Sequence, residues 1–166
     1  MKTIFALGFV FVLAGPLLGQ NLRVDSRLRP ILDDFLNYCK VYQIDFEEKL
    51  LALERIDIVD DLDDSSSATT LGMLQRNTQG EVKTIAISPI AQIDPEILKV
   101  ITFHELGHYF LEYRKHVCHD CGEIMAVINS SYFDVVRDWD NQVKILFERS
   151  PAYQRRLEVA TTSIDD

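Results

Sequence analysis

The segment His104-Glu105-Leu106-Gly107-His108 constrains this chain more than any other feature of its sequence. Residues four apart lie one above the other on one face of an α-helix, so both imidazoles can reach a single ion if the segment is helical. Glu105 then projects about 100° further round the helix, where it can hold a water molecule without taking a coordination position. The spacing therefore predicts a helix that carries a metal centre.

The residues around this segment favour a helix. Asp94-Pro95-Glu96 supplies an N-cap, a proline in the first helical position and a carboxylate in the first turn. Mostly apolar residues follow, and the run 96–116 contains no proline and no glycine other than Gly107. We therefore expect a long helix through the two histidines that ends just before His116.

A catalytic zinc ion needs a third protein ligand and an open position for water. The candidates beyond His108 are Glu112, His116, His119, Asp120 and Glu123. Glu112 is disfavoured because three ligands on successive turns of one straight helix would spread over about 12 Å. We favour His116 because it lies just past the expected helix end, with His119 as the alternative. Alternatively, a positively charged His116 could cap the C-terminus of the helix.

The two histidines and the following Ile124-Met125 resemble the zincin metallopeptidases, in particular the metzincin branch, where a methionine turn lies beneath the zinc ion. The resemblance covers roughly residues 94 to 126. Leu111 and Arg114 stand where the metzincin pattern has a glycine and its third histidine. The spacing from His116 to Met125 is close to that in metzincin-like proteins with compact cysteine-containing loops.

This resemblance implies an α+β fold in a small, divergent member of bacterial type. It implies a twisted, mostly antiparallel sheet packed with a zinc-binding helix, an N-terminal helix and a C-terminal helix. The implied activity is zinc-dependent hydrolysis of peptide bonds, with Zn²⁺ held by His104, His108 and His116 and with Glu105 as general base. Met125 would form the floor of the site, and a peptide or protein substrate would lie along an edge strand.

Two other functions remain open. A zincin-fold binding or interaction protein would hold zinc without turnover, and a closed site with both His116 and His119 would indicate it. A zinc hydrolase that acts on a non-peptide amide is the other alternative. Tyr132 or His119 could stabilise the oxyanion in a hydrolase, although a tyrosine at the start of an amphipathic helix more often serves packing.

The cysteines allow several states. Cys118 and Cys121 could form a short disulfide, a redox-active pair or half of a structural zinc site, and we favour the disulfide because an export signal is expected. Cys39 falls on the apolar face of an expected helix and is interpreted as a buried free thiol.

The N-terminal segment 1–19 is typical of a signal peptide, because Lys2 precedes a run of apolar residues. An uncleaved membrane anchor is the alternative. Removal of the 19 residues would leave residues 20–166 as one domain with a net charge of −10, since Lys2 is lost from a chain of charge −9. Neither nucleic acid nor an anionic membrane suits so acidic a surface. Because of the expected signal peptide, we expect a secreted or periplasmic protein.

The remaining elements follow from hydrophobic periodicity. We expect a core-facing helix over residues 28–42, and strands at 56–59, 70–76 and 82–88, the last two joined by a turn. A second long amphipathic helix is expected over 132–147, with Trp139 in the core. The acidic run at 60–64 lacks the glycine and the distant glutamate of a helix-loop-helix calcium site and is interpreted as a solvated loop.

Overall fold

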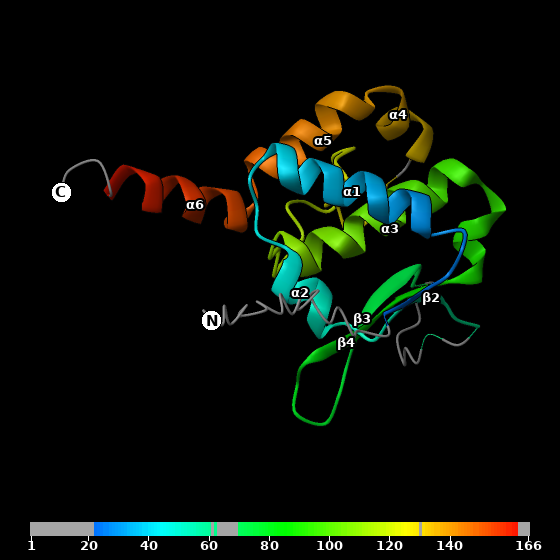
Figure 1. Ribbon diagram of the computed structural model, residues 1–166. Coiled ribbons are helices and arrows are strands. Elements are labelled where there is room, and N and C mark those ends of the chain that lie inside the picture. Colours follow the sequence, from blue (N-terminus) through cyan, green and yellow to red (C-terminus); the bar gives the residue numbers. More distant parts are fainter. Residues whose placement is uncertain (1–21, 61, 63–69, 130, 163–166) are drawn as a thin grey trace, which may run out of the picture.

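A four-stranded sheet forms one side of the molecule and most of the helices lie on the other (Figure 1). The computed structural model describes residues 22–60, 62, 70–129 and 131–162. The strands are β1 (Arg23–Val24), β2 (Arg55–Ile58), β3 (Gly72–Arg76) and β4 (Val82–Ile87), arranged in the order β1-β2-β4-β3. Among the described strands, this order makes β3 an edge strand.

The expected α+β class is confirmed, but the sheet is mixed and not mostly antiparallel. β1 and β2 pair in parallel, as do β2 and β4, and only the β3–β4 hairpin is antiparallel. The reason lies in the strand order. After β2 the chain returns in the opposite direction along β3 at the sheet edge, and it then reverses again into β4, which lies between them. β4 therefore runs parallel to β2. Sequence periodicity predicts that strands exist but carries no information on which strands become neighbours.

Seven helical segments accompany the sheet in the described residues. They are α1 (Arg29–Val41), α2 (Glu47–Ala52), the 3-10 turn η1 (Pro89–Ile93), α3 (Pro95–Phe110), α4 (Tyr132–Arg137), α5 (Trp139–Glu148) and α6 (Pro151–Thr162). Helix α3 lies between the sheet and α1, and α6 projects away from the rest (Figure 1). No described helix is both long enough and apolar enough to span a bilayer.

Helix α3 begins as its sequence predicts and ends earlier than expected. The Asp94 carboxylate accepts a hydrogen bond from the backbone N–H of Glu96 at 2.7 Å, and Pro95 occupies the first turn. The helix stops at Phe110 because Glu112 adopts a left-handed conformation with φ of 67°. Lys49 of α2 also donates from Nζ to the carbonyl oxygens of Tyr109 and Phe110, at 3.4 and 3.0 Å. These contacts cap the helix end before His116.

Aromatic side chains pack α3 against α1 and α5. The ring of Phe35 in α1 lies 5.2 Å from that of Phe103, 5.9 Å from that of Phe110 and 5.3 Å from that of Phe147. All four side chains are fully buried, as is the free thiol of Cys39. The predicted buried cysteine is therefore confirmed, and the helix of the two histidines is held in the core.

The C-terminal part differs from the single long helix that the sequence predicts. The chain breaks at Asp138 into α4 and α5, and α6 follows after Ser150. Trp139 is only partly buried, packs edge-on against Phe103 at 4.7 Å and carries Lys99 Nζ 4.0 Å above its ring. The expected signal segment 1–19 and most of the acidic run 60–64 lie outside the described residues.

Candidate metal centre

Three histidine side chains converge in the structure. The Nε2 atoms of His104 and His108, both on α3, lie 3.1 Å apart, and Nε2 of His116 lies 3.1 Å from that of His104. One ring nitrogen of each histidine falls within 4.8 Å of the others. Nitrogen ligands of a tetrahedral zinc ion, each about 2.0–2.1 Å from the metal, lie about 3.3 Å from one another. The spacing of the three rings is therefore suitable for one metal ion.

Backbone carbonyl groups set the tautomers of the two helical histidines. Nδ1 of His104 lies 2.7 Å from the carbonyl oxygen of Ile124, and Nδ1 of His108 lies 2.5 Å from that of Tyr113. A carbonyl oxygen can only accept, so each Nδ1 must donate its proton. In the neutral rings, Nε2 then carries a lone pair that faces the other histidines. Such lone pairs repel at this distance, and a cation between them removes the repulsion.

The protonation of the rings favours the same interpretation. Burial lowers the pKa of His104 to about 4, and it also lowers the pKa values of His108 and His116. Repulsion from the positive charge that His108 and His116 carry when protonated lowers the pKa of His104 further. At neutral pH the buried His104 ring is therefore uncharged, which is the state that binds a metal ion.

A backbone ladder holds the loop that carries His116. The N–H of Val117 donates to the carbonyl of Met125 at 3.0 Å, and the N–H of Val127 donates to that of Cys118 at 3.0 Å. Cys118 and Cys121 are joined in a disulfide, the state that the sequence favours. The loop therefore pairs with the segment around Met125, whose neighbour Ile124 orients His104.

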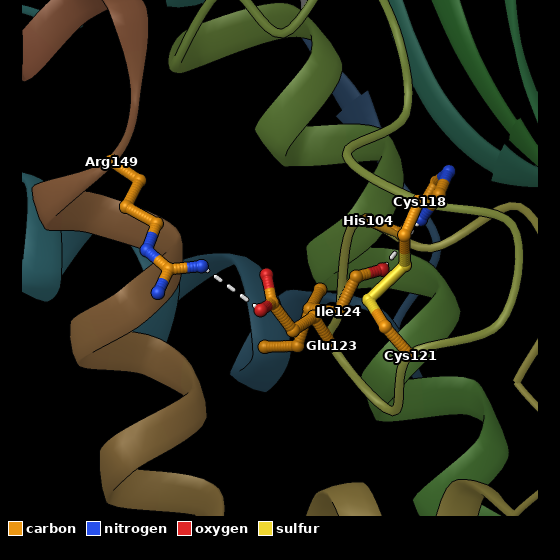
Figure 2. The surroundings of a disulfide bond; sticks show 6 residues. All are labelled: His104, Cys118, Cys121, Glu123, Ile124 and Arg149. Atoms are coloured by element: carbon orange, nitrogen blue, oxygen red, sulfur yellow. Dashed lines mark hydrogen bonds and ion pairs between the residues drawn. A yellow bond between two sulfur atoms is a disulfide. The ribbon is translucent and has the colours of Figure 1, made fainter.

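An ion pair joins the same loop to α5. Figure 2 shows Glu123 reaching toward Arg149, and their side chains lie 2.9 Å apart. In the same view the backbone of Ile124 faces His104, close to the disulfide. The position of the loop over α3 is thus stabilised from two sides.

Met125 is buried and packs against the helix at Gly107. A Cβ atom built on Gly107 would lie 2.9 Å from the Met125 Sδ, closer than real Cβ contacts come. The glycine inside the histidine motif therefore makes room for the methionine. The structure places Met125 beside the histidine motif.

Glu105 lies on α3 next to His104 and is only 6% exposed. Burial raises the pKa of its carboxyl group to about 8 in the metal-free protein. A cation at the three histidines would favour the ionised form and lower this pKa. Glu105 is thus a buried titratable group in the same cleft as the histidines, and its protonation would respond to a bound cation.

The three histidines and Glu105 open into one cleft of about 710 Å³. Gly72 of β3 lines one side, and Ile128 and Tyr132 line another. The wall is largely apolar, with Val127 and Ile128 about half exposed at its rim. Gly72 is the first residue of β3, the outer strand of the described sheet, so of the strands expected at 70–76 and 82–88 it is the first that lies at the sheet edge.

Among the described residues, the other candidate ligands are not part of the three-histidine group. His119 lines the cleft but is not in the group of three histidines. Glu112 makes ion pairs with Lys49 at 2.7 Å and with Arg155 at 2.6 Å, and Glu123 pairs with Arg149. Tyr132 lines the cleft and is partly buried against the core, as its packing interpretation expects. The structure therefore brings together the preferred ligand set.

Several residues that shape the site carry no signal in the sequence. The carbonyl groups of Ile124 and Tyr113 orient the histidines through the backbone, which no residue type reveals. Lys49 acts on α3 from about 60 positions away along the chain. Only Gly107 could have been noticed, because a glycine inside a long helix usually has a packing reason.

The chain matches no protein-family model, no curated protein and no solved structure with which it was compared. The description of the site therefore rests on its own residues and geometry.

Proposed function

We propose that this protein is a zinc-dependent peptidase. The observation that carries the proposal is the convergence of three imidazole nitrogens on one point, with the buried Glu105 beside them in the same cleft. Three nitrogen donors are typical of a zinc site that keeps an open position. In the described residues His119 does not join the group, which supports an open site over a closed, purely structural one.

When bound at the three histidines, zinc would supply Lewis acidity, the chemistry that polarises a carbonyl group and promotes the ionisation of water. The chain's own residues do the rest. The Glu105 carboxylate accepts the proton of the attacking water and returns it to the nitrogen of the leaving amine. The Ile124 and Tyr113 carbonyls keep the His104 and His108 rings in their ligating tautomer.

The open edge of β3 supports a peptide over a small amide as substrate. In the described residues β3 pairs with β4 alone, which leaves its other edge available for pairing with an extended chain. Backbone pairing would place a peptide bond beside the three histidines without dependence on particular side chains. A non-peptide amide would leave this edge unused.

We also propose that the protein is exported. The segment 1–19 supports this proposal by its composition, and the Cys118–Cys121 disulfide supports it because such bonds persist in oxidising compartments.

A peptide-cleavage assay tests the proposed activity. We expect the zinc-loaded chain to cut a diverse peptide mixture and the Glu105→Ala variant to cut it at least about a thousandfold more slowly, while both bind zinc equally. Mass spectrometry would identify the products and elemental analysis the zinc content. Equal cleavage by the variant, or no cleavage by folded, zinc-replete wild-type protein, would refute the proposal.

A further inference from the structure

Gly72, the first residue of the edge strand β3, lies against the side chain of Glu105. A Cβ atom built on Gly72 would lie 2.6 Å from Glu105 Cγ, 2.7 Å from Oε1 and 2.9 Å from Cδ. All three distances are shorter than real Cβ atoms show. The Glu105 side chain therefore occupies the space that the Cβ atom of any other residue at position 72 would need.

The backbone of Gly72 does not itself require glycine. The described glycines with positive φ are Gly80 and Gly122, and Gly72 is not among them. Gly72 also pairs in register with Ile87 of β4. Because glycine weakens a strand relative to other residues, a glycine in ordinary strand conformation points to a close approach by another group.

We propose that Gly72 is a positioning residue, which fixes the Glu105 carboxylate beside the three histidines by leaving this space open. The catalytic part of this inference rests on the proposed peptidase function. Its structural part, the steric coupling of residues 72 and 105, does not depend on that function.

Relief of the crowding through the Glu105 side chain moves the carboxylate. The nearest atom to the added Cβ is Cγ, which stands close to the helix backbone and not at the free end of the side chain. A rotation that moves Cγ swings Cδ and both carboxylate oxygens with it. A displacement of about 1 Å at a reacting group can lower a rate by roughly a hundredfold. The three histidines are not among the nearest atoms to the added Cβ, so zinc binding should be unaffected.

A double-mutant cycle on the metal-free protein tests the steric coupling. In the chain with Glu105, Gly72→Ala should raise the unfolding equilibrium constant by about tenfold or more, as overpacking does. In the Glu105→Ala background, which lacks Cγ and the carboxylate, Gly72→Ala should change this constant by less than about threefold or lower it. Denaturant unfolding measures all four proteins.

Gly80→Ala is the matched control. Gly80 has φ of 83° and no atom within 4 Å of an added Cβ, so alanine strains the backbone without meeting Glu105. Gly80→Ala should therefore raise the unfolding equilibrium constant by the same factor in the wild-type and the Glu105→Ala backgrounds. If Gly72→Ala does not fold but its combination with Glu105→Ala does, the coupling is supported. If the cost of Gly72→Ala is equal in both backgrounds, or if neither protein folds, the proposal is overturned.

The kinetic arm uses the zinc-loaded protein. Gly72→Ala should lower kcat by about a hundredfold, with KM and zinc affinity within about threefold of wild type. Unchanged kcat despite steric coupling would overturn the positioning role. Absence of cleavage by wild-type protein together with a positive cycle would refute the peptidase function and leave the structural coupling in place.

Discussion

At the scale of single residues, the site depends on neutral histidines whose free nitrogens face one another. The Nε2 atoms of His104 and His108 lie 3.1 Å apart while both Nδ1 atoms donate to carbonyl groups. No hydrogen bond can form between these two nitrogens, because both carry lone pairs. The folded chain therefore holds its imidazoles in a geometry that a bound cation stabilises.

The three cysteines differ sharply in their expected reactivity. Burial raises the pKa of the Cys39 thiol to about 12, and Cys118 and Cys121 are joined in a disulfide. Because the thiolate is the nucleophile, Cys39 should react with iodoacetamide at pH 8 about a hundredfold or more slowly than an exposed thiol. Intact mass measured without reductant should show no label on the native chain and one on the unfolded chain. Rapid labelling of native protein would contradict the buried position of Cys39.

The sequence predicted the residues of the site better than their surroundings. Two histidines four apart require a helix, and position alone favoured His116 over His119. The Gly72 contact was not predictable, because it depends on where β3 crosses α3 in space. Local patterns encode helix faces, whereas contacts between distant segments need the three-dimensional structure.

At the scale of elements, α3 is anchored beyond its C-terminus by a charged group. The Glu112 carboxylate accepts from Arg155 of α6 and from Lys49 of α2, and Lys49 also caps α3. Arg155 and Lys49 lower the pKa of Glu112 from 4.5 to about 2. These contacts join the C-terminal end of α3 to α2 and α6, and α3 ends just before the loop that carries His116.

The lowered pKa predicts how stability depends on pH. The folded state holds Glu112 ionised more strongly than the unfolded state, so its stabilisation is present above about pH 4.5 and is lost as pH falls toward about 2. We expect Glu112→Gln to cost about 1 kcal/mol at pH 6, since the pair is partly solvated, and almost nothing at pH 2. Denaturant unfolding across this range measures the difference.

Glu48→Gln is the control, because Glu48 is an exposed carboxylate on the neighbouring helix α2. Its effect should be small at both pH values. A cost of Glu112→Gln that stays constant from pH 6 to pH 2 would show that the carboxylate charge does not anchor α3.

Element boundaries show where sequence periodicity loses information. The apolar pattern through Phe147 predicted one helix, but the chain turns at Asp138 so that α4 and α5 can each face α3. Helix α2 and the two-residue strand β1 are too short to produce a readable pattern. The sequence does not predict the helix end at position 112, because a glutamate in the left-handed conformation is rare and is held here by contacts distant in sequence.

At the scale of the whole molecule, the fold brings three separate segments to one cleft. The helix α3 contributes two histidines and Glu105, and the loop that contains the Cys118–Cys121 disulfide and the residues just before it contributes His116. β3 contributes an edge strand. The α+β class was implied by the zincin resemblance and by the predicted order of one helix, about three strands and two further helices. The parallel pairing of β2 with β4 was not, because strand order is a property of the assembled sheet.

The central claim is that His104, His108 and His116 bind one metal ion. Zinc titration of the metal-free protein in competition with a chromophoric chelator tests this claim most directly. His119→Ala is the matched control, three residues from His116 in the same loop. We predict one zinc ion per chain for the wild type and for His119→Ala, and at least about a hundredfold weaker binding for His116→Ala. Undiminished binding by His116→Ala, or loss in His119→Ala alone, would contradict the account.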